Sequence, residues 1–324
     1  MTIIKLKKPK KANANNCTLS IDKSTLLIRA NYADETKLFE QIALTLCEIG
    51  WLKPENTKVR NYQRTYSIPE FEDHGKVLIS TRPKFAANAP LRLETNPNRL
   101  GKSSVNILLK KVCDHFLDGD WNEFSSRVDI SRADVAIDLF DLSITQAHFT
   151  APGAKMYQCF HGNGGRKQTE IMKFPGNKRI SIYDKASEQK ELTLKNKKIA
   201  ICDIPPVWTR VETNLAKCGL LKNLGNLKNP FLDFSMSQIV KPQDFDDNLW
   251  KFFCIAADAT NTGAMMALLS AIQRKTLKIH QSKYPIVGWD AKKLWELWPD
   301  AVANSGLTDF LQMNSKPLIN YHVK

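Results

Sequence analysis

The sequence predicts an α+β fold, in which two tandem β-α-β-β-β units form a pseudo-symmetric antiparallel sheet with helices packed on it, followed by a helical C-terminal region. Two observations carry this prediction. Segments rich in alternating apolar and β-branched residues occur twice in the order strand, helix, three strands. From about residue 218 the pattern changes to a Gly- and Asn-rich stretch and then to apolar residues at helical spacing. Strands and helices in this order are typical of antiparallel α+β domains.

The first unit begins with the strand 24–30, in which apolar and β-branched residues dominate. A helix follows over 31–50, because its apolar residues recur at helical spacing and the pattern ends at Gly50. Three short strands are expected next, at 64–68, 76–81 and 90–95. A further helix with an apolar face closes the unit at 103–117.

The second unit begins with a long alternating strand over 126–140, and Ser143 is expected to cap a short helix over 143–150. Four more strands are predicted, at 155–161, 169–174, 179–185 and 206–215. The stretch 217–230 is predicted to be a loop, and helices are predicted at 247–259, 263–277 and 290–298. The predicted domains are a basic N-terminal arm over 1–20, a sheet domain over 21–225 with halves of about 21–120 and 121–225, and the helical region over 226–324.

Composition narrows the class of protein. The chain of 324 residues has 43% hydrophobic and 25% charged residues, which is ordinary for a soluble globular protein. We expect no membrane span, since no apolar run is long enough, and the first eleven residues lack the apolar core of a signal peptide. These features predict a cytoplasmic protein. The seven cysteines form no CxxC pair, which argues against a zinc site and against a disulfide framework.

The net charge of +14 predicts a polyanionic partner. Half of this excess lies between Lys155 and Lys217, where thirteen Lys or Arg face six Asp or Glu. We expect phosphate contacts from Lys155, Arg166, Lys167, Lys178 and Arg179 in this stretch. A second basic region on the C-terminal helices is suited to duplex DNA, with Lys275, Lys278, Lys283, Lys292 and Lys293. The basic arm over 5–11 would either bind phosphates or be a tail.

Three strands place polar residues on one face. Because side chains alternate along a strand, Arg132, Asp134 and Asp138 share a face of RADVAID. In the same way Arg210 and Glu212 share a face of WTRVETN, and Tyr183 and Lys185 share a face of RISIYDK. If the strands are neighbours, Asp134, Asp138 and Glu212 offer hard oxygen ligands that suit Mg²⁺ or Mn²⁺. The alternative is a solvent-facing sheet with cross-strand Arg–Asp pairs.

These blocks, ISRADVAIDLF, RISIYDKASE and VWTRVETNL, resemble the rolling-circle replication initiation factor family of plasmids and phages, particularly proteins of the filamentous phage gene II type. The resemblance covers roughly residues 75 to 275. It implies a metal-dependent, site-specific DNA nicking-closing enzyme (an endonuclease and strand transferase) whose catalytic domain is the sheet domain. The enzyme nicks one strand at a phage or plasmid origin through a covalent 5′-phosphotyrosyl intermediate and leaves a 3′-OH primer. The sequence lacks the His-hydrophobe-His motif of the better-known rolling-circle enzymes.

In this interpretation Tyr183 is the nucleophile, Lys185 and the metal favour its phenolate, and Arg132 and Arg210 assist or orient the acids. Origin DNA, both duplex and single-stranded, is the expected partner, together with host helicase and polymerase and no membrane. Glu94 is either a fourth carboxylate or an ordinary strand acid. Two alternatives stay open: a DNA-binding regulator that does not cut, and a metal-dependent nuclease without a covalent intermediate.

Overall fold

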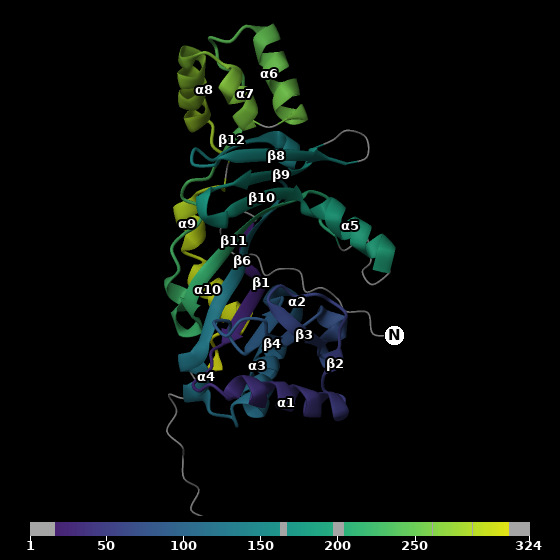
Figure 1. Cartoon of the computed structure of the whole chain (residues 1–324). Helices are drawn as coiled ribbons and strands as arrows, with labels where there is room; N and C mark the ends of the chain where they lie inside the picture. The colour runs from purple at the N-terminus through teal and green to yellow at the C-terminus, as the bar shows by residue number, and fades with distance from the viewer. Residues whose placement is uncertain (1–16, 163–166, 197–203, 261, 287, 311–324) are drawn as a thin grey trace, which may run out of the picture. The chain divides into compact units, whose positions relative to one another are not determined.

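The structure is a computed structural model, and it describes residues 17–162, 167–196, 204–260, 262–286 and 288–310 (Figure 1). The strands are β1 (Cys17–Ile28), β2 (Lys53–Pro54), β3 (Tyr62–Ser67), β4 (Leu78–Pro83), β5 (Leu91–Thr95), β6 (Val128–Phe140), β7 (Ala147–Thr150), β8 (Met156–His161), β9 (Lys167–Lys173), β10 (Arg179–Asp184), β11 (Trp208–Leu220) and β12 (Ser235–Gln238). The α-helices are α1 (Glu35–Glu48), α2 (Pro97–Leu100), α3 (Lys102–Phe116), α4 (Trp121–Arg127), α5 (Lys185–Asn196), α6 (Asp247–Ala259), α7 (Thr262–Leu268), α8 (Ala271–Lys283), α9 (Ala291–Trp295) and α10 (Trp298–Ser305).

The central element is a ten-stranded antiparallel sheet, in the order β2-β3-β4-β5-β1-β6-β11-β10-β9-β8. The first strand of each half, β1 or β6, lies beside the last strand of its own half, β5 or β11, and the preceding strands continue outward. This order confirms the predicted α+β class, and the mainly helical C-terminal region is confirmed as well. The remaining two strands, β7 and β12, pair separately.

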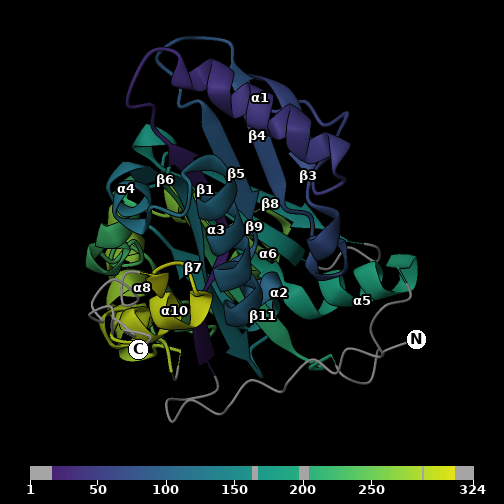
Figure 2. The ribbon, with the colours of Figure 1, turned by 90° about the horizontal axis from the view of Figure 1, so that it is seen from below.

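The chain divides into two compact units that interleave along the sequence. One unit contains residues 136–214 and 229–296, and the other contains 20–135, 215–228 and the last residues from 297. In the second of these, α1 lies across one face of the strands β3, β4 and β5 (Figure 2). The core there includes Phe39 of α1, Ile79 of β4 and Leu93 of β5, all fully buried. The apolar residues whose spacing predicted this helix therefore form the face that packs on the sheet.

The second half departs from the predicted β-α-β-β-β order at two places. Ser143 does form a capping box, but the helix that it caps is a single 3₁₀ turn at Ile144–Gln146, and the chain continues as β7. The predicted helix over 143–150 is wrong because its second part is extended and pairs with β12. A helix that the sequence did not predict, α5, stands instead between β10 and β11.

Further differences between the predicted and the observed elements concern where a strand ends and where a helix is interrupted. The stretch predicted as a loop over 217–230 contains the end of β11 and a 3₁₀ helix at Leu221–Asn226. The single helix predicted over 263–277 is two helices, α7 and α8, because Ser270 caps a new helix start. Within the described residues, no helix is both long and apolar enough to cross a membrane.

Candidate active site on strands β10 and β11

Tyr183 lies on β10 and faces the neighbouring strand β11. The two strands are antiparallel, with Tyr183 opposite Arg210 and Ser181 opposite Glu212. Residues opposite each other in an antiparallel pair project to the same face of the sheet. Ile180 and Ile182 fill the other face and are fully buried. The apolar alternation of RISIYDK therefore fixes the side of the sheet on which the tyrosine hydroxyl lies.

The hydroxyl of Tyr183 donates a hydrogen bond to Glu212 Oε2, with 3.0 Å between the two oxygens. The phenol of Tyr183 is a half-exposed group held against a carboxylate. A carboxylate at this distance is in position to accept the proton of the hydroxyl.

Lys185 adds a positive charge beside the tyrosine ring. Its Nζ lies 5.5 Å from the centre of the Tyr183 ring and also donates a hydrogen bond to Glu188. The lysine side chain is only 8% exposed, because it begins α5 directly after β10. Asp184 fixes this change of direction, since its carboxylate accepts hydrogen bonds from the backbone N–H and the hydroxyl of Ser187. The strand-to-helix turn thus holds the ammonium near the phenol.

Arg210 and Asp138 form a buried pair. Arg210 Nε donates to Asp138 Oδ1 at 2.7 Å, and Nη2 donates to Oδ2 at 2.8 Å. Trp208 Nε1 donates a further hydrogen bond to Asp138 Oδ1 at 2.7 Å. Both charged side chains are almost fully buried, so the bidentate geometry compensates for their loss of hydration. Trp208 shares a face of β11 with Arg210, but the sequence did not predict that its indole would hold Asp138.

Arg132 and Asp134 form a second bidentate pair, within the other unit. Arg132 Nε donates to Asp134 Oδ1 at 2.7 Å, and Nη2 donates to Oδ2 at 2.6 Å. Asp134 is buried, whereas the arginine side chain is 40% exposed. Both residues lie on β6, on the same side of the strand as Asp138, since positions an even number apart share a face.

The three acids predicted as metal ligands do not form a ligand set in this arrangement. Across the ranges that the structure describes, no three His, Cys, Asp or Glu side chains gather so that they could hold a metal ion. Asp134 is paired with Arg132, Asp138 with Arg210, and Glu212 accepts from Tyr183. As placed, the carboxylates do not fit Mg²⁺ or Mn²⁺, since each would first have to exchange a protein donor for the cation.

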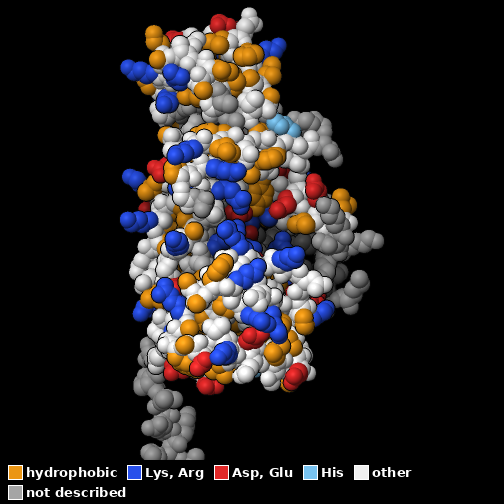
Figure 3. Space-filling model, viewed as in Figure 1, with side chains coloured by type: hydrophobic (Ala, Val, Ile, Leu, Met, Phe, Trp, Pro, Cys, Tyr) orange, Lys and Arg blue, Asp and Glu red, His pale blue; other side chains and the backbone are white. Residues whose placement is uncertain are grey.

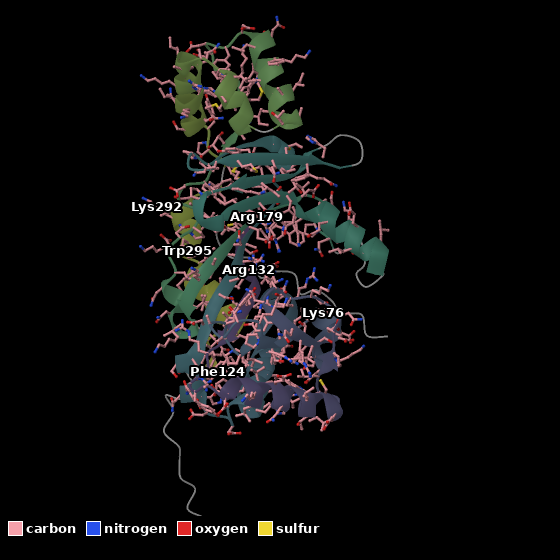
Figure 4. All side chains as sticks on the ribbon, viewed as in Figure 1. Lys76, Phe124, Arg132, Arg179, Lys292 and Trp295 are labelled. Atoms are coloured by element: carbon pink, nitrogen blue, oxygen red, sulfur yellow. The ribbon has the colours of Figure 1, made fainter. Side chains whose placement is uncertain are left out.

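Of the residues predicted to contact DNA phosphates, three are described in full. Lys155 is exposed just before β8, and Arg179, labelled in Figure 4, is half-buried at the start of β10. Lys178 lies 4.8 Å from the ring centre of Phe174 and 4.0 Å from the carboxylate of Asp233. Arg166 and the side chain of Lys167 lie outside the described residues.

Tyr157 lies on β8, two strands away from β10 in the sheet. Its hydroxyl donates to the backbone carbonyl of Ala151 at 2.7 Å, and its ring packs against Gly263, where an added Cβ would lie 2.9 Å away. Burial raises the pKa of Tyr157, the hydrogen bond to Ala151 lowers it by a smaller amount, and the charge of Glu170 adds a still smaller rise. These contacts are those of a side chain that packs in the fold, so Tyr157 is a packing residue.

Two tryptophans of the C-terminal region pack against aromatic side chains. Trp289 contacts the ring of Phe234 at 5.2 Å and that of Phe231 at 6.3 Å. Trp295, labelled with Lys292 on α9 in Figure 4, also meets Phe231, at 6.5 Å. Both tryptophan side chains are half-buried in this packing.

A repeat of five residues links the site to the first half of the chain. The sequence R-x-E-T-N occurs at 92–96, beginning on β5, and again at 210–214 on β11. The strand pairings repeat as well: Ser80 of β4 lies opposite Arg92, as Tyr183 of β10 lies opposite Arg210. Ser80 thus takes the position of the tyrosine in the first half. The repeat is a sequence signal that becomes visible when residues 92–96 and 210–214 are compared with each other.

The contacts of the first copy differ. Glu94 accepts from Lys23 Nζ at 2.5 Å and from Arg92. Burial raises the pKa of Glu94, but the hydrogen bonds and charges of Lys23 and Arg92 together lower it more, so the net shift is downward. Glu94 is therefore an ion-paired strand acid in this structure.

No protein-family model matches the chain, and no curated protein matches it in sequence. A solved structure of a rolling circle replication initiator protein from Geobacillus stearothermophilus is similar to it, with a TM-score of 0.41 and 12% sequence identity. The similarity covers 76% of this chain and 98% of that chain.

Proposed function

We propose that the protein is a rolling-circle replication initiator that nicks one DNA strand through a covalent bond between Tyr183 and the 5′ phosphate. The observation that carries the proposal is the hydrogen bond from the Tyr183 hydroxyl to Glu212, next to the ammonium of Lys185. A phenol with a pKa near 10 is a weak nucleophile at neutral pH. A carboxylate that accepts its proton and a cation that favours its phenolate are the groups such a nucleophile requires.

In the proposed reaction the Tyr183 oxygen attacks the phosphorus of a phosphodiester while its proton passes to Glu212. A bond forms between the tyrosine oxygen and phosphorus, the bond from phosphorus to the 3′ oxygen breaks, and that oxygen takes up a proton from solvent. The products are a 5′-phosphotyrosyl ester and a free 3′-OH. The ester conserves the energy of the phosphodiester bond, so a 3′-OH can later reverse the step and reseal the strand.

The remaining site residues have separate roles in this proposal. Arg210 is buried against Asp138, so it acts as a positioning residue that holds β11 and Glu212 in register. Arg132, which is partly exposed, is the arginine proposed to contact phosphate oxygens. Lys155, Lys178 and Arg179 would bind the backbone of the DNA, as would Arg166 and Lys167. The family resemblance proposes Mg²⁺ or Mn²⁺ as cofactor, and binding it would require the carboxylates to exchange their present donors.

Covalent capture from a random-sequence library tests the proposal and selects the preferred DNA site in the same experiment. The protein is incubated with single-stranded DNA of random sequence and Mg²⁺ or Mn²⁺, denatured, and separated from unbound DNA. DNA that stays attached is sequenced, which identifies the site. Wild-type protein should retain DNA at its 5′ end.

Two matched variants assign the nucleophile. Tyr183→Phe keeps the ring and removes the hydroxyl, so it should retain no DNA, whereas Tyr157→Phe should retain it as the wild type does. Binding of DNA without any covalent product would instead support the regulator, and cleavage without an adduct would support the plain nuclease.

A further inference from the structure

The helices α6, α7 and α8 form a module with its own core, in the unit that contains residues 229–296 (Figure 1). The core consists of buried side chains from all three helices and the chain before them, namely Phe245, Phe253, Ala257, Met265, Leu269 and Leu277. Because this core accounts for the inward faces of the helices, the side chains that point outward need another explanation.

The connection between α7 and α8 is only two residues long. Leu269 is buried in the module core, and Ser270 caps α8 with a capping box that includes Gln273. Two helices joined by a short turn, with the second helix anchored at its first turn, are held at a fixed angle. The outward face of α8 is therefore presented on a rigid support.

That outward face combines positive charge with apolar side chains. The exposed basic residues of the helix are Lys275, Lys278 and Lys283, whereas Arg274 is half-buried and donates to the backbone carbonyl of Ala267 at 3.5 Å. The helix has no Asp or Glu over its thirteen residues. Among the described residues, none of these three lysines has an ion-pair partner. By contrast Lys241, which lies before α6, pairs with Asp247, the first residue of α6. Figure 3 shows blue basic atoms next to orange apolar atoms over α8. Three exposed lysines with no acid on their own helix favour a polyanionic partner.

Ile272 and Ile279 distinguish one kind of polyanion from another. They are 79% and 49% exposed, and with Lys275 they occupy positions i, i+3 and i+7, along one stripe of the helix. The major groove of duplex DNA is about 12 Å wide, admits an α-helix and offers thymine methyl groups to apolar side chains. Single-stranded DNA is bound mainly by aromatic stacking, and α8 contains no Phe, Tyr or Trp.

We infer that α8 is a reading helix that enters the major groove of duplex DNA, with Lys275 and Lys278 on phosphates and Ile272 and Ile279 toward the base edges. At thirteen residues the helix is about 20 Å long, which suits a contact of a few base pairs. The inference rests on the proposed function in one respect, since it makes the duplex origin the target of the module. The protein would then already be bound to its duplex site when the strand to be cut reaches Tyr183.

The first test measures binding to a 30-base-pair duplex of random sequence as a function of salt, which is independent of any nicking. The double variant Lys275→Gln/Lys278→Gln should bind on the order of tenfold to a hundredfold more weakly near 0.1 M salt, and the slope of log K against log salt should fall by about two. Lys251→Gln, an exposed lysine of α6 in the same module, is the matched control and should change binding by less than about threefold. Circular dichroism melting confirms that each variant is folded.

The second test measures discrimination. On the duplex form of the site recovered by covalent capture, Ile272→Ser should lower the preference over random duplex by about threefold to tenfold and leave the salt slope unchanged. The inference is overturned if the double variant binds duplex DNA as Lys251→Gln does. It is equally overturned if the α8 variants lose binding to vesicles of anionic lipid but keep binding to duplex. Failure of the proposed function would appear separately, as a wild-type protein that forms no covalent adduct.

Discussion

The strands β5 and β11 carry the same R-x-E-T-N sequence but differ in what surrounds it. On β11, Glu212 accepts a hydrogen bond from the hydroxyl of Tyr183, and Arg210 is paired with Asp138 of β6. On β5, Glu94 accepts from two cations, Lys23 and Arg92, and the residue opposite Arg92 is Ser80. The same short sequence therefore gives a carboxylate next to a tyrosine hydroxyl in one half and a carboxylate closed into ion pairs in the other.

The comparison teaches that the strand motif alone does not define the site. What differs is the neighbouring strand: β6 supplies Asp138 to Arg210, whereas β1 places Leu27 opposite Arg92. Without an acid from β1, Arg92 turns to the glutamate of its own strand, and its Nη1 is buried with no hydrogen-bond partner among the described residues. The first half repeats the strand order around this motif without the arrangement proposed for catalysis.

The largest effect is expected from removing the charge of the two glutamates in turn. Glu212→Gln should slow formation of the covalent adduct by about 10²- to 10⁴-fold, because the amide cannot accept the phenolic proton. Glu94→Gln should change the rate by less than about threefold. Single-turnover assays on a captured DNA site measure both. Equal losses in the two variants would show that the halves do not differ as described.

The two arginines should differ in their effect on stability. Among the described residues, Arg210→Gln leaves the Trp208 indole as the remaining donor to the buried Asp138, and should cost about 3–5 kcal/mol in the free energy of unfolding. Arg92→Gln leaves Glu94 paired with Lys23 and should cost about 1–2 kcal/mol. Urea unfolding followed by circular dichroism gives both values. A larger cost for Arg92 would contradict the assignment of the buried pair to β11.

The smallest expected effect concerns acid pH and Glu94. Its pKa is lowered in the folded protein from a reference value of 4.5, so its contribution to stability is present above pH 4.5 and is lost as the pH falls through the folded pKa. Glu94→Gln should therefore be less stable than wild type at neutral pH, and the difference should shrink below pH 4.5. Urea midpoints at pH 7 and at pH 3.5 compare the two proteins. A difference that grows on acidification would have the wrong sign.

Much of the fold could be predicted from the sequence, because strand alternation and helical spacing are local. The helix α1 and the strands β3, β4 and β5 follow from periodic apolar residues that face one core. The helix expected after Ser143 failed because the pairing of β7 with β12, some 85 residues further along, is not visible locally. The break between α7 and α8 had a local signal, the Ser270 and Gln273 capping box, inside a continuous apolar pattern that concealed it.

For the candidate site, alternation placed Tyr183, Arg210 and Glu212 on common faces of their strands, and the register then sets Tyr183 opposite Arg210. The sequence could not tell which donor each acid would take. Whether Asp138 faces a metal ion or an arginine depends on the distance between side chains of β6 and β11, and on an indole from Trp208. Such choices are decided by tertiary packing, where hydrogen-bond donors compete for each carboxylate.

The most direct test of the proposed chemistry is peptide mapping of the covalent adduct. Wild-type protein is allowed to react with its captured DNA, the DNA is trimmed with nuclease, and the protein is digested after Lys and Arg. We predict a nucleotide mass on the peptide Ile180–Lys185, attached to Tyr183 through the 5′ phosphate, and a free 3′-OH on the other DNA end. A nucleotide on any other residue, or a cut strand with no nucleotide on the protein, would contradict the assignment of Tyr183 as the nucleophile.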